Sequence, residues 1–245
     1  MEKRVKMIIY EIFKDLNIDI KQIEVIPYKR TARCAKKFCC RDAHRKFLLV
    51  IAESKIQQFY LRRNIEKQFL FANEWDIEFS FILPLSYGMK DGFYYAVYPF
   101  FEADEVDKDR CVDALKVIYS KYSKKTRVTQ EVINKIEEDL LSAFPERFHE
   151  SIKELELYKM YFQYLIKENE LFICRVHGDY AINNILQNGQ NLFLLDFEFS
   201  TDYQVAEYDM YYFNHLKGRS VNQLMLNKIH DIKHQLQDAI NELID

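Results

Sequence analysis

The segment of residues 176–199 constrains the fold most, because it holds two apolar runs that carry acidic and amide side chains at their ends. Asp179 and Asn184 lie in the first half of this segment, and an apolar run in the second half ends on Asp196. Between the two halves, Asn188-Gly189 is the strongest short-range signal for a β-hairpin. We therefore expect a hairpin that brings Asn184 and Asp196 together.

These side chains suit phosphoryl transfer. In that chemistry one aspartate accepts the proton of an acceptor hydroxyl, while an asparagine and a second aspartate hold Mg²⁺ against the nucleotide phosphates. Asp179, Asn184 and Asp196 fit these roles in that order, and Glu198 is a weaker candidate for metal binding. Taken singly, each residue is better explained as a cap, a turn or a solvated strand end. Their joint spacing favours a catalytic loop with a metal site.

The spacing matches the H-x-D-x-x-x-x-N and D-F-G signatures of protein kinases. Gly178 in place of Arg, and Glu198 in place of the Gly of D-F-G, resemble the aminoglycoside phosphotransferase and choline kinase group, the small-molecule relatives of protein kinases. Asp209 resembles a further aspartate that this group carries after its metal loop. The resemblance is specific over about residues 175–210. It implies that His177 and Asp209 support the loop backbone rather than perform the chemistry.

The first hundred residues predict a sheet with two helices. Apolar spacing predicts a helix over residues 3–16, and the capping box at Ser54 and Gln57 predicts a second helix that runs to residue 73. Alternating and β-branched runs predict antiparallel strands over residues 20–26, 32–40, 46–52, 79–85 and 93–101.

In the kinase arrangement, a lysine of the third strand pairs with a glutamate of the following helix and with the nucleotide phosphates. Glu66 suits the glutamate, although an ordinary exposed helix charge explains it equally well. Val50 stands at the expected lysine position. Lys46, four residues earlier, lies on the same side of the strand and is our candidate for phosphate binding, with Lys55 as an alternative.

The resemblance places the hinge between two lobes at Tyr98-Pro99-Phe100. Tyr98 and Phe100 are therefore expected to contact the adenine of ATP, which would bond to the backbone there. An aromatic core strand explains the same residues equally well. No glycine precedes Gly88, so the chain lacks the glycine-rich phosphate loop of protein kinases.

Residues 107–170 show helical spacing throughout. After the first helix of this region, a predicted loop carries a basic cluster that fits a solvated loop better than an anion site: Lys121, Lys124, Lys125 and Arg127. A second capping box, at residues 220–223, opens a final helix. Its His230 and His234 resemble a zinc-protease helix, but they lie opposite the apolar stripe and Asp replaces Glu at position 231, so a metal hydrolase is disfavoured.

Composition excludes several other classes. The 35 basic and 38 acidic residues give a net charge of −3, which argues against nucleic acid as the main partner. No apolar run approaches the ~18 residues that a membrane span needs. The five cysteines form no C-x-x-C pair, which favours reduced thiols. We expect a cytoplasmic, untargeted protein of unknown oligomeric state.

The prediction is thus a two-lobed, protein-kinase-like α+β fold. Residues 1–100 would form an N-terminal nucleotide-binding lobe with an antiparallel sheet, and residues 101–245 a larger helical lobe that carries catalytic and substrate sites. The expected activity is ATP- and Mg-dependent phosphorylation of a hydroxyl on a sugar, amino alcohol, aminoglycoside or polysaccharide precursor. A pseudokinase is the alternative, because the lysine and glycine loop are missing. A protein kinase is disfavoured, because no A-P-E-like segment follows Glu198.

Overall fold

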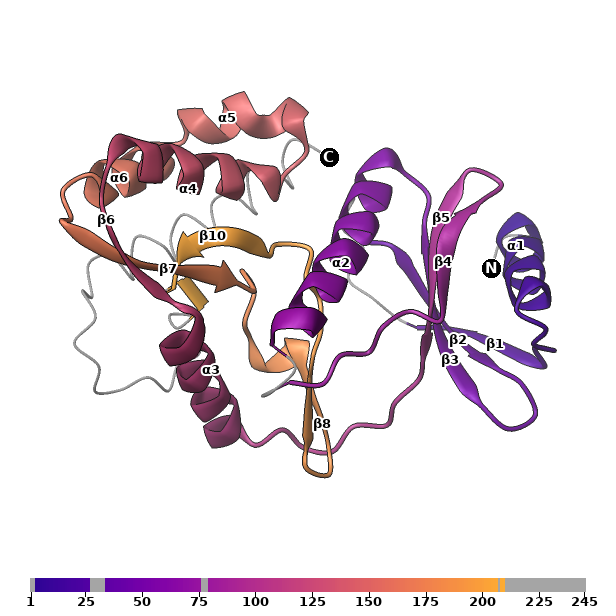
Figure 1. Ribbon diagram of the computed structural model, residues 1–245. Coiled ribbons are helices and arrows are strands. Elements are labelled where there is room, and N and C mark those ends of the chain that lie inside the picture. The colour runs from indigo at the N-terminus through magenta and orange to yellow at the C-terminus, as the bar shows by residue number, and fades with distance from the viewer. Residues whose placement is uncertain (1–2, 27–33, 76–78, 207, 210–245) are drawn as a thin grey trace.

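A computed structural model describes residues 3–26, 34–75, 79–206 and 208–209 and arranges them in two lobes (Figure 1). The first lobe is built on an antiparallel sheet with the strand order β1-β2-β3-β5-β4. Its strands are β1 (Gln22–Val25), β2 (Lys36–Arg41), β3 (Lys46–Ala52), β4 (Ser86–Lys90) and β5 (Phe93–Pro99). The prediction of an antiparallel sheet of about five strands is confirmed, but β4 was not among the predicted strands and takes the place of the one expected over residues 79–85.

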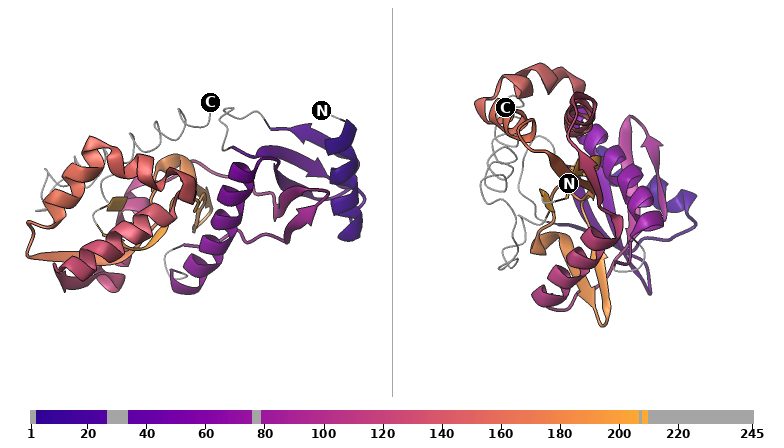
Figure 2. Two further views of the ribbon diagram at one scale, coloured as in Figure 1. Left: turned by 90° about the horizontal axis from the view of Figure 1, so that it is seen from above. Right: turned by 60° about the vertical axis from the view of Figure 1, so that its left-hand side comes forward.

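Helix α1 (Lys3–Asp15) covers the outer face of this sheet, away from the second lobe (Figures 1 and 2). Five of its apolar residues are buried and recur at helical spacing, so they form one stripe: Val5, Ile8, Ile9, Ile12 and Phe13. That stripe packs against Phe38, Leu49 and Ile51, which point outward from β2 and β3. The predicted N-terminal helix is confirmed, and it closes the outer side of the lobe.

Helix α2 (Lys55–Glu74) lies between the inner face of the sheet and the second lobe (Figure 2). The predicted capping box begins it: the Ser54 side chain accepts the Gln57 backbone N–H, and the Gln57 side chain accepts the Ser54 N–H. Leu61 packs in a cluster with residues of the sheet, whereas Tyr60 packs in the core of the second lobe. Phe71 belongs to a third hydrophobic cluster, which also contains Trp75. This one helix therefore belongs to the cores of both lobes.

An ion-pair network also ties α2 to the second lobe. Lys67 is buried and pairs with Asp202, while Arg175 pairs with both Asp202 and Glu74. Burial alone would raise the pKa of Asp202, but the hydrogen bond and charge of Lys67, followed by Arg175, outweigh it and lower that pKa. The network fixes α2 against the strands that carry Arg175 and Asp202.

The second lobe combines helices with two small sheets. Its helices are α3 (Lys108–Tyr122), α4 (Gln130–Ser142), α5 (His149–Glu154) and α6 (Glu156–Leu165), with 3₁₀ turns η1 (Glu146–Phe148) and η2 (Ile182–Asn184). One sheet has the order β10-β7-β6, and the hairpin pairs β8 with β9. Their bounds are β6 (Lys124–Arg127), β7 (Glu170–Val176), β8 (Ile185–Asn188), β9 (Asn191–Leu194) and β10 (Thr201–Val205).

Two local predictions are wrong. Of the basic cluster placed in a loop, Lys121 lies in the last turn of α3, and the other three residues belong to strand β6, which pairs with β7. The strand predicted over residues 79–85 does not form; only Ser80 makes an isolated bridge, to Phe193 of β9. Two backbone groups of this segment bond outside the five-stranded sheet: the Ser80 N–H donates to the Leu192 carbonyl, and the Ile82 carbonyl accepts from the Gln68 side chain of α2.

Other predictions concern features away from the sheets. All five cysteines are free, as predicted. Within the described ranges, no helix has the length and apolar character needed to cross a membrane. The final helix with His230 and His234 lies outside the described residues, and the lobe boundary near residue 100 stays a prediction.

Candidate active site

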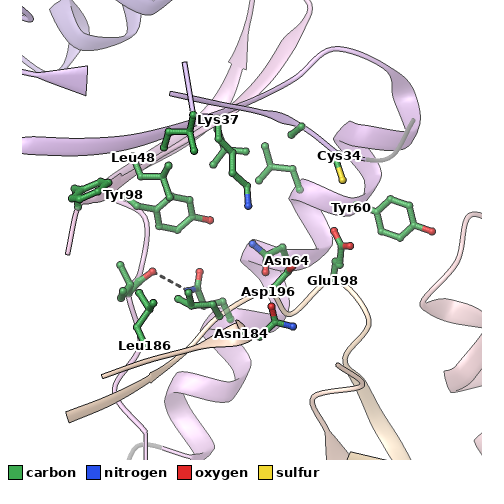
Figure 3. Close-up of a pocket in the computed structure, with 18 of the residues that line it drawn as sticks. Cys34, Lys37, Leu48, Tyr60, Asn64, Tyr98, Asn184, Leu186, Asp196 and Glu198 are labelled. Atoms are coloured by element: carbon green, nitrogen blue, oxygen red, sulfur yellow. Dashed lines mark hydrogen bonds between the residues drawn. The ribbon is translucent and has the colours of Figure 1, made fainter. Parts of the chain in front are cut away.

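A cavity of about 540 Å³ lies between the inner face of the sheet, α2 and the β8–β9 hairpin (Figure 3). Strands β2, β3 and β5 supply its roof, and Asn184, Asp196 and Glu198 lie on the opposite side. All three predicted metal ligands therefore face one cavity, together with the predicted nucleotide contacts Tyr98 and Phe100.

The loop that follows β7 is held by the carboxylate of Asp209. One Asp209 oxygen accepts the His177 backbone N–H and the other accepts the Gly178 N–H at 2.8 Å. Asp209 is buried, so these bonds are shielded from water. Gly178 has φ +78°, and a Cβ there would meet the Phe199 carbonyl oxygen at 2.2 Å. Only glycine fits this approach of two backbones.

His177 joins this loop to the second acidic site. Its Nε2 contacts the Leu195 carbonyl at 2.8 Å, and its Nδ1 accepts the Asp179 backbone N–H at 3.2 Å. Together these bonds require the neutral ring with the proton on Nε2. The side chain is fully buried, which agrees with a supporting role and leaves that role a prediction.

Asp179 and Asn184 are directly bonded. The Asn184 side-chain amide donates to the Asp179 carbonyl at 2.9 Å and to its carboxylate at 3.0 Å. Turn η2 (Ile182–Asn184) makes this possible, because it folds the intervening residues into one 3₁₀ turn. Asn184 lines the cavity, whereas the half-buried Asp179 is connected to the cavity through it.

The predicted hairpin brings Asn184 next to the second acidic site. Strands β8 and β9 pair from Ile185↔Leu194 to Asn188↔Asn191, and the Leu195 N–H donates to the Asn184 carbonyl at 2.8 Å. Asp196 follows with φ +64°, an uncommon left-handed conformation for a residue other than glycine. Asp196 lines the cavity directly after this hairpin.

Helix α2 positions the segment after Asp196, which the sequence did not reveal. The Asn64 side-chain oxygen accepts the Phe197 N–H at 2.6 Å, and Arg63 donates to the carbonyls of Glu198 and Ser200. Burial lowers the pKa of Arg63 from its high ordinary value. No apolar pattern singled out Asn64 in the sequence, because the same face of α2 also carries Gln57 and Gln68.

The structure does not bring Glu66 or Lys46 to this cavity. The α2 residues that line it are spaced by three or four positions, namely Gln57, Tyr60, Leu61, Asn64 and Gln68. Glu66 is two positions from Asn64, which turns it about 200° around the helix to an exposed face. Lys46 lies on the predicted side of β3 but at its far end, where it pairs with Glu102.

Tyr98 and Phe100 stay candidates for nucleotide contact. Tyr98 is buried, and its hydroxyl has no hydrogen-bond partner among the described residues. Burial, and then the charge of Asp196, raise the pKa of Tyr98 above its ordinary value. The Phe100 N–H donates to the Lys46 carbonyl at 3.2 Å, so this backbone donor is already used.

The donor set fits magnesium rather than a softer metal. Asn184 and Asp196 offer amide and carboxylate oxygens, the hard ligands that Mg²⁺ prefers, and Glu198 adds a carboxylate nearby. Within the described residues, no three His, Cys, Asp or Glu side chains gather closely enough to hold a metal ion. A magnesium ion here needs further oxygen ligands, which water and phosphate supply.

Comparisons with known proteins identify the fold. No protein-family model and no curated protein matches the sequence. Among solved structures, a protein assigned as a fructosamine-3-kinase from Haemophilus somnus 129PT is 13% identical, with a TM-score of 0.61 over 98% of this chain and 88% of its own.

Two phosphotransferases are similar as well. A spectinomycin phosphotransferase bound to ADP and spectinomycin gives 13% identity and a TM-score of 0.54 over 96% of this chain and 87% of its own. An aminoglycoside phosphotransferase bound to AMP-PNP and hygromycin B gives 10% identity and a TM-score of 0.53 over 99% and 84%. The prediction of fold is confirmed: this chain has the two-lobed, protein-kinase-like fold of these small-molecule phosphotransferases.

Proposed function

We propose that this protein is a phosphotransferase that moves the γ-phosphoryl group of ATP, with Mg²⁺, to a hydroxyl of a small molecule. One observation carries the proposal. Asn184 lines the cavity beside Asp196 and donates its amide to Asp179, so the acid–base group is bonded to one of two oxygen ligands that face the same cavity. Phosphoryl transfer depends mainly on such positioning and on charge stabilisation.

Each residue has a role in the proposed reaction. The acceptor oxygen attacks the γ-phosphorus, the bond from that phosphorus to the bridging oxygen breaks, and ADP leaves. The Asp179 carboxylate accepts the hydroxyl proton and holds the acceptor oxygen in line. Asn184 and Asp196 would hold magnesium, which neutralises charge on the phosphates when bound. His177 and Asp209 keep the loop that carries Asp179 in place.

The fold neighbours support the same class. Their printed names describe kinases of small molecules, and two of them contain ADP or AMP-PNP together with an antibiotic acceptor. For this chain, sugars, amino alcohols, aminoglycosides and polysaccharide precursors are the acceptors to test. We expect such an enzyme to be located in the cytoplasm.

A pseudokinase is the second candidate, and Val50 favours it. This buried residue lines the cavity at the position where the resemblance expects a lysine. A protein that only binds a nucleotide or a protein partner would tolerate that loss. The bond between Asn184 and Asp179, with Asp196 at the same cavity, favours the enzyme instead, because binding alone does not require a positioned acid–base group.

The test combines nucleotide binding with turnover. We would titrate Mg-ATP and Mg-GTP into the protein by calorimetry and then assay ADP release with a panel of the four acceptor classes, with Asp179→Asn as the matched variant. Acceptor-dependent release that Asp179→Asn removes supports the enzyme. Binding without turnover on every acceptor favours the pseudokinase, and absence of nucleotide binding contradicts both functions.

A further inference from the structure

One basic side chain lines the cavity among the described residues, and it comes from a strand that the resemblance does not single out. Lys37 of β2 extends from the roof toward the side that carries Asn64 and Asp196 (Figure 3). The acidic residues of the lining are Asp196 and Glu198. A bound triphosphate would add further negative charge, so this cavity needs a cation besides magnesium.

The position of Lys37 follows from the register of the sheet. Lys37 pairs directly with Val50 across the antiparallel strands β2 and β3, and Val50 pairs with Ala96 of β5 on its other side. Directly opposite residues project from the same face, with Cβ atoms about 4.5–5.5 Å apart. The four-carbon stem of a lysine spans such a distance. Lys37 can therefore place its ammonium in the volume that a lysine at position 50 would use.

Two other lysines of β2 and β3 form ion pairs with glutamates. Lys36 points to the other face of β2 and pairs with Glu53 at 2.6 Å, while Lys46 pairs with Glu102. Within the described ranges, Lys37 forms no ion pair. An ammonium that faces a cavity and has no carboxylate partner is available to an anionic ligand.

We propose that Lys37, on β2, binds the phosphate chain of the nucleotide in place of a lysine at position 50. The inference rests on the proposed function, because it names a residue that binds the nucleotide of that reaction. It also explains how the cavity would tolerate Val50: the charge is kept and only the strand that carries it differs. Lys37 would neutralise the nonbridging phosphate oxygens with a flexible point charge.

Binding measurements separate a phosphate contact from a structural effect. We would compare the affinities for Mg-ATP and for adenosine in wild type, Lys37→Met and the matched control Lys36→Met. Lys37→Met should weaken Mg-ATP binding about 10- to 100-fold, the size of a lost charge-assisted hydrogen bond, and should leave adenosine affinity within about twofold. Lys36→Met should bind both ligands like wild type, because its side chain lies on the other face.

A relocation variant makes the test stricter. Lys37→Val combined with Val50→Lys moves the charge to the adjacent strand, and recovery of Mg-ATP affinity relative to Lys37→Val alone supports the proposal. No recovery overturns the argument from register. Wild-type Mg-ATP binding in Lys37→Met, or equal losses for ATP and adenosine, overturns the assignment of Lys37 and leaves the proposed function standing. A wild type that binds no nucleotide overturns both.

Discussion

The side-chain amide of Asn184 donates hydrogen bonds to the carbonyl and the carboxylate of Asp179, at 2.9 and 3.0 Å. The predicted base and one predicted metal ligand are therefore physically coupled. A substitution at Asn184 changes the metal site and also releases Asp179 from its partner. Effects on turnover should for that reason be non-additive between the two positions, as expected for residues in direct contact.

The first prediction concerns the close approach at Gly178. Gly178→Ala should be severely destabilising, because its Cβ would lie 2.2 Å from a backbone oxygen of Phe199 and φ is +78°. Gly189→Ala is the matched control, since it also has positive φ but its Cβ would meet nothing within 4 Å. Gly189→Ala should lower the free energy of unfolding by only about 1 kcal/mol. Urea unfolding measures the stability of both variants. Equal losses of stability in Gly178→Ala and Gly189→Ala would contradict the explanation by a steric clash.

The second prediction concerns His177. His177→Ala removes the partner of two backbone groups in a fully buried position, so it should lower stability by about 1–3 kcal/mol or more as well as reduce turnover. His149→Ala is the control. His149 also contacts a backbone carbonyl, that of Phe144, but it lies away from the cavity. If His177→Ala melted like wild type and lost only turnover, His177 would contact the reacting groups instead.

The third prediction uses the lowered pKa of Asp202. A carboxylate with a folded pKa below its unfolded value of about 3.9 stabilises the protein above that pH, and its contribution disappears as pH falls through the folded pKa. Asp202→Asn should therefore be less stable than wild type at pH 7, with the difference shrinking below about pH 4. Asp113→Asn, in an exposed pair with Lys116, should change stability by less than about 1 kcal/mol. Denaturant midpoints measured across pH test this prediction. A stability difference between wild type and Asp202→Asn that persists in acid contradicts the ion-pair explanation.

The sequence predicted those elements whose signal is local. The capping box of α2, the strand over residues 46–52 and the Asn188-Gly189 hairpin each depend on neighbouring residues, and each forms as expected. The prediction of a loop where strand β6 forms was wrong, because the signal for this strand is not local. Its lysines are mostly exposed, so the segment has no apolar alternation, and only pairing with β7 makes it a strand.

The candidate site divides in the same way. The spacing of Asp179, Asn184 and Asp196 along the chain was enough to group them, because a short turn and a hairpin connect them. Lys37 faces the cavity only through its register opposite Val50, which requires the pairing of two strands. Sequence spacing along a single strand led instead to Lys46, whose distance from the cavity was not visible without the sheet.

The fourth prediction tests the metal ligands. Asp196→Asn should abolish transfer, and Asn184→Ala should raise the Mg²⁺ concentration for half-maximal turnover by at least about tenfold. Asn191→Ala, an exposed change in the same hairpin, should leave the Mg²⁺ requirement unchanged. The measurement is turnover against Mg²⁺ at saturating nucleotide. Full activity with an unaltered Mg²⁺ curve in either site variant would remove the assignment.

The last prediction is that Asp179→Asn separates catalysis from binding. The amide keeps the shape of the side chain but cannot accept the acceptor's proton, so turnover should fall by roughly 10²–10⁴. Nucleotide affinity should change little, because Asp179 does not line the cavity and is bonded to Asn184, which does. Single-turnover rates and Mg-ATP calorimetry on the same preparations measure the two effects. A parallel loss of affinity and rate would show that Asp179 organises the nucleotide site rather than the acceptor.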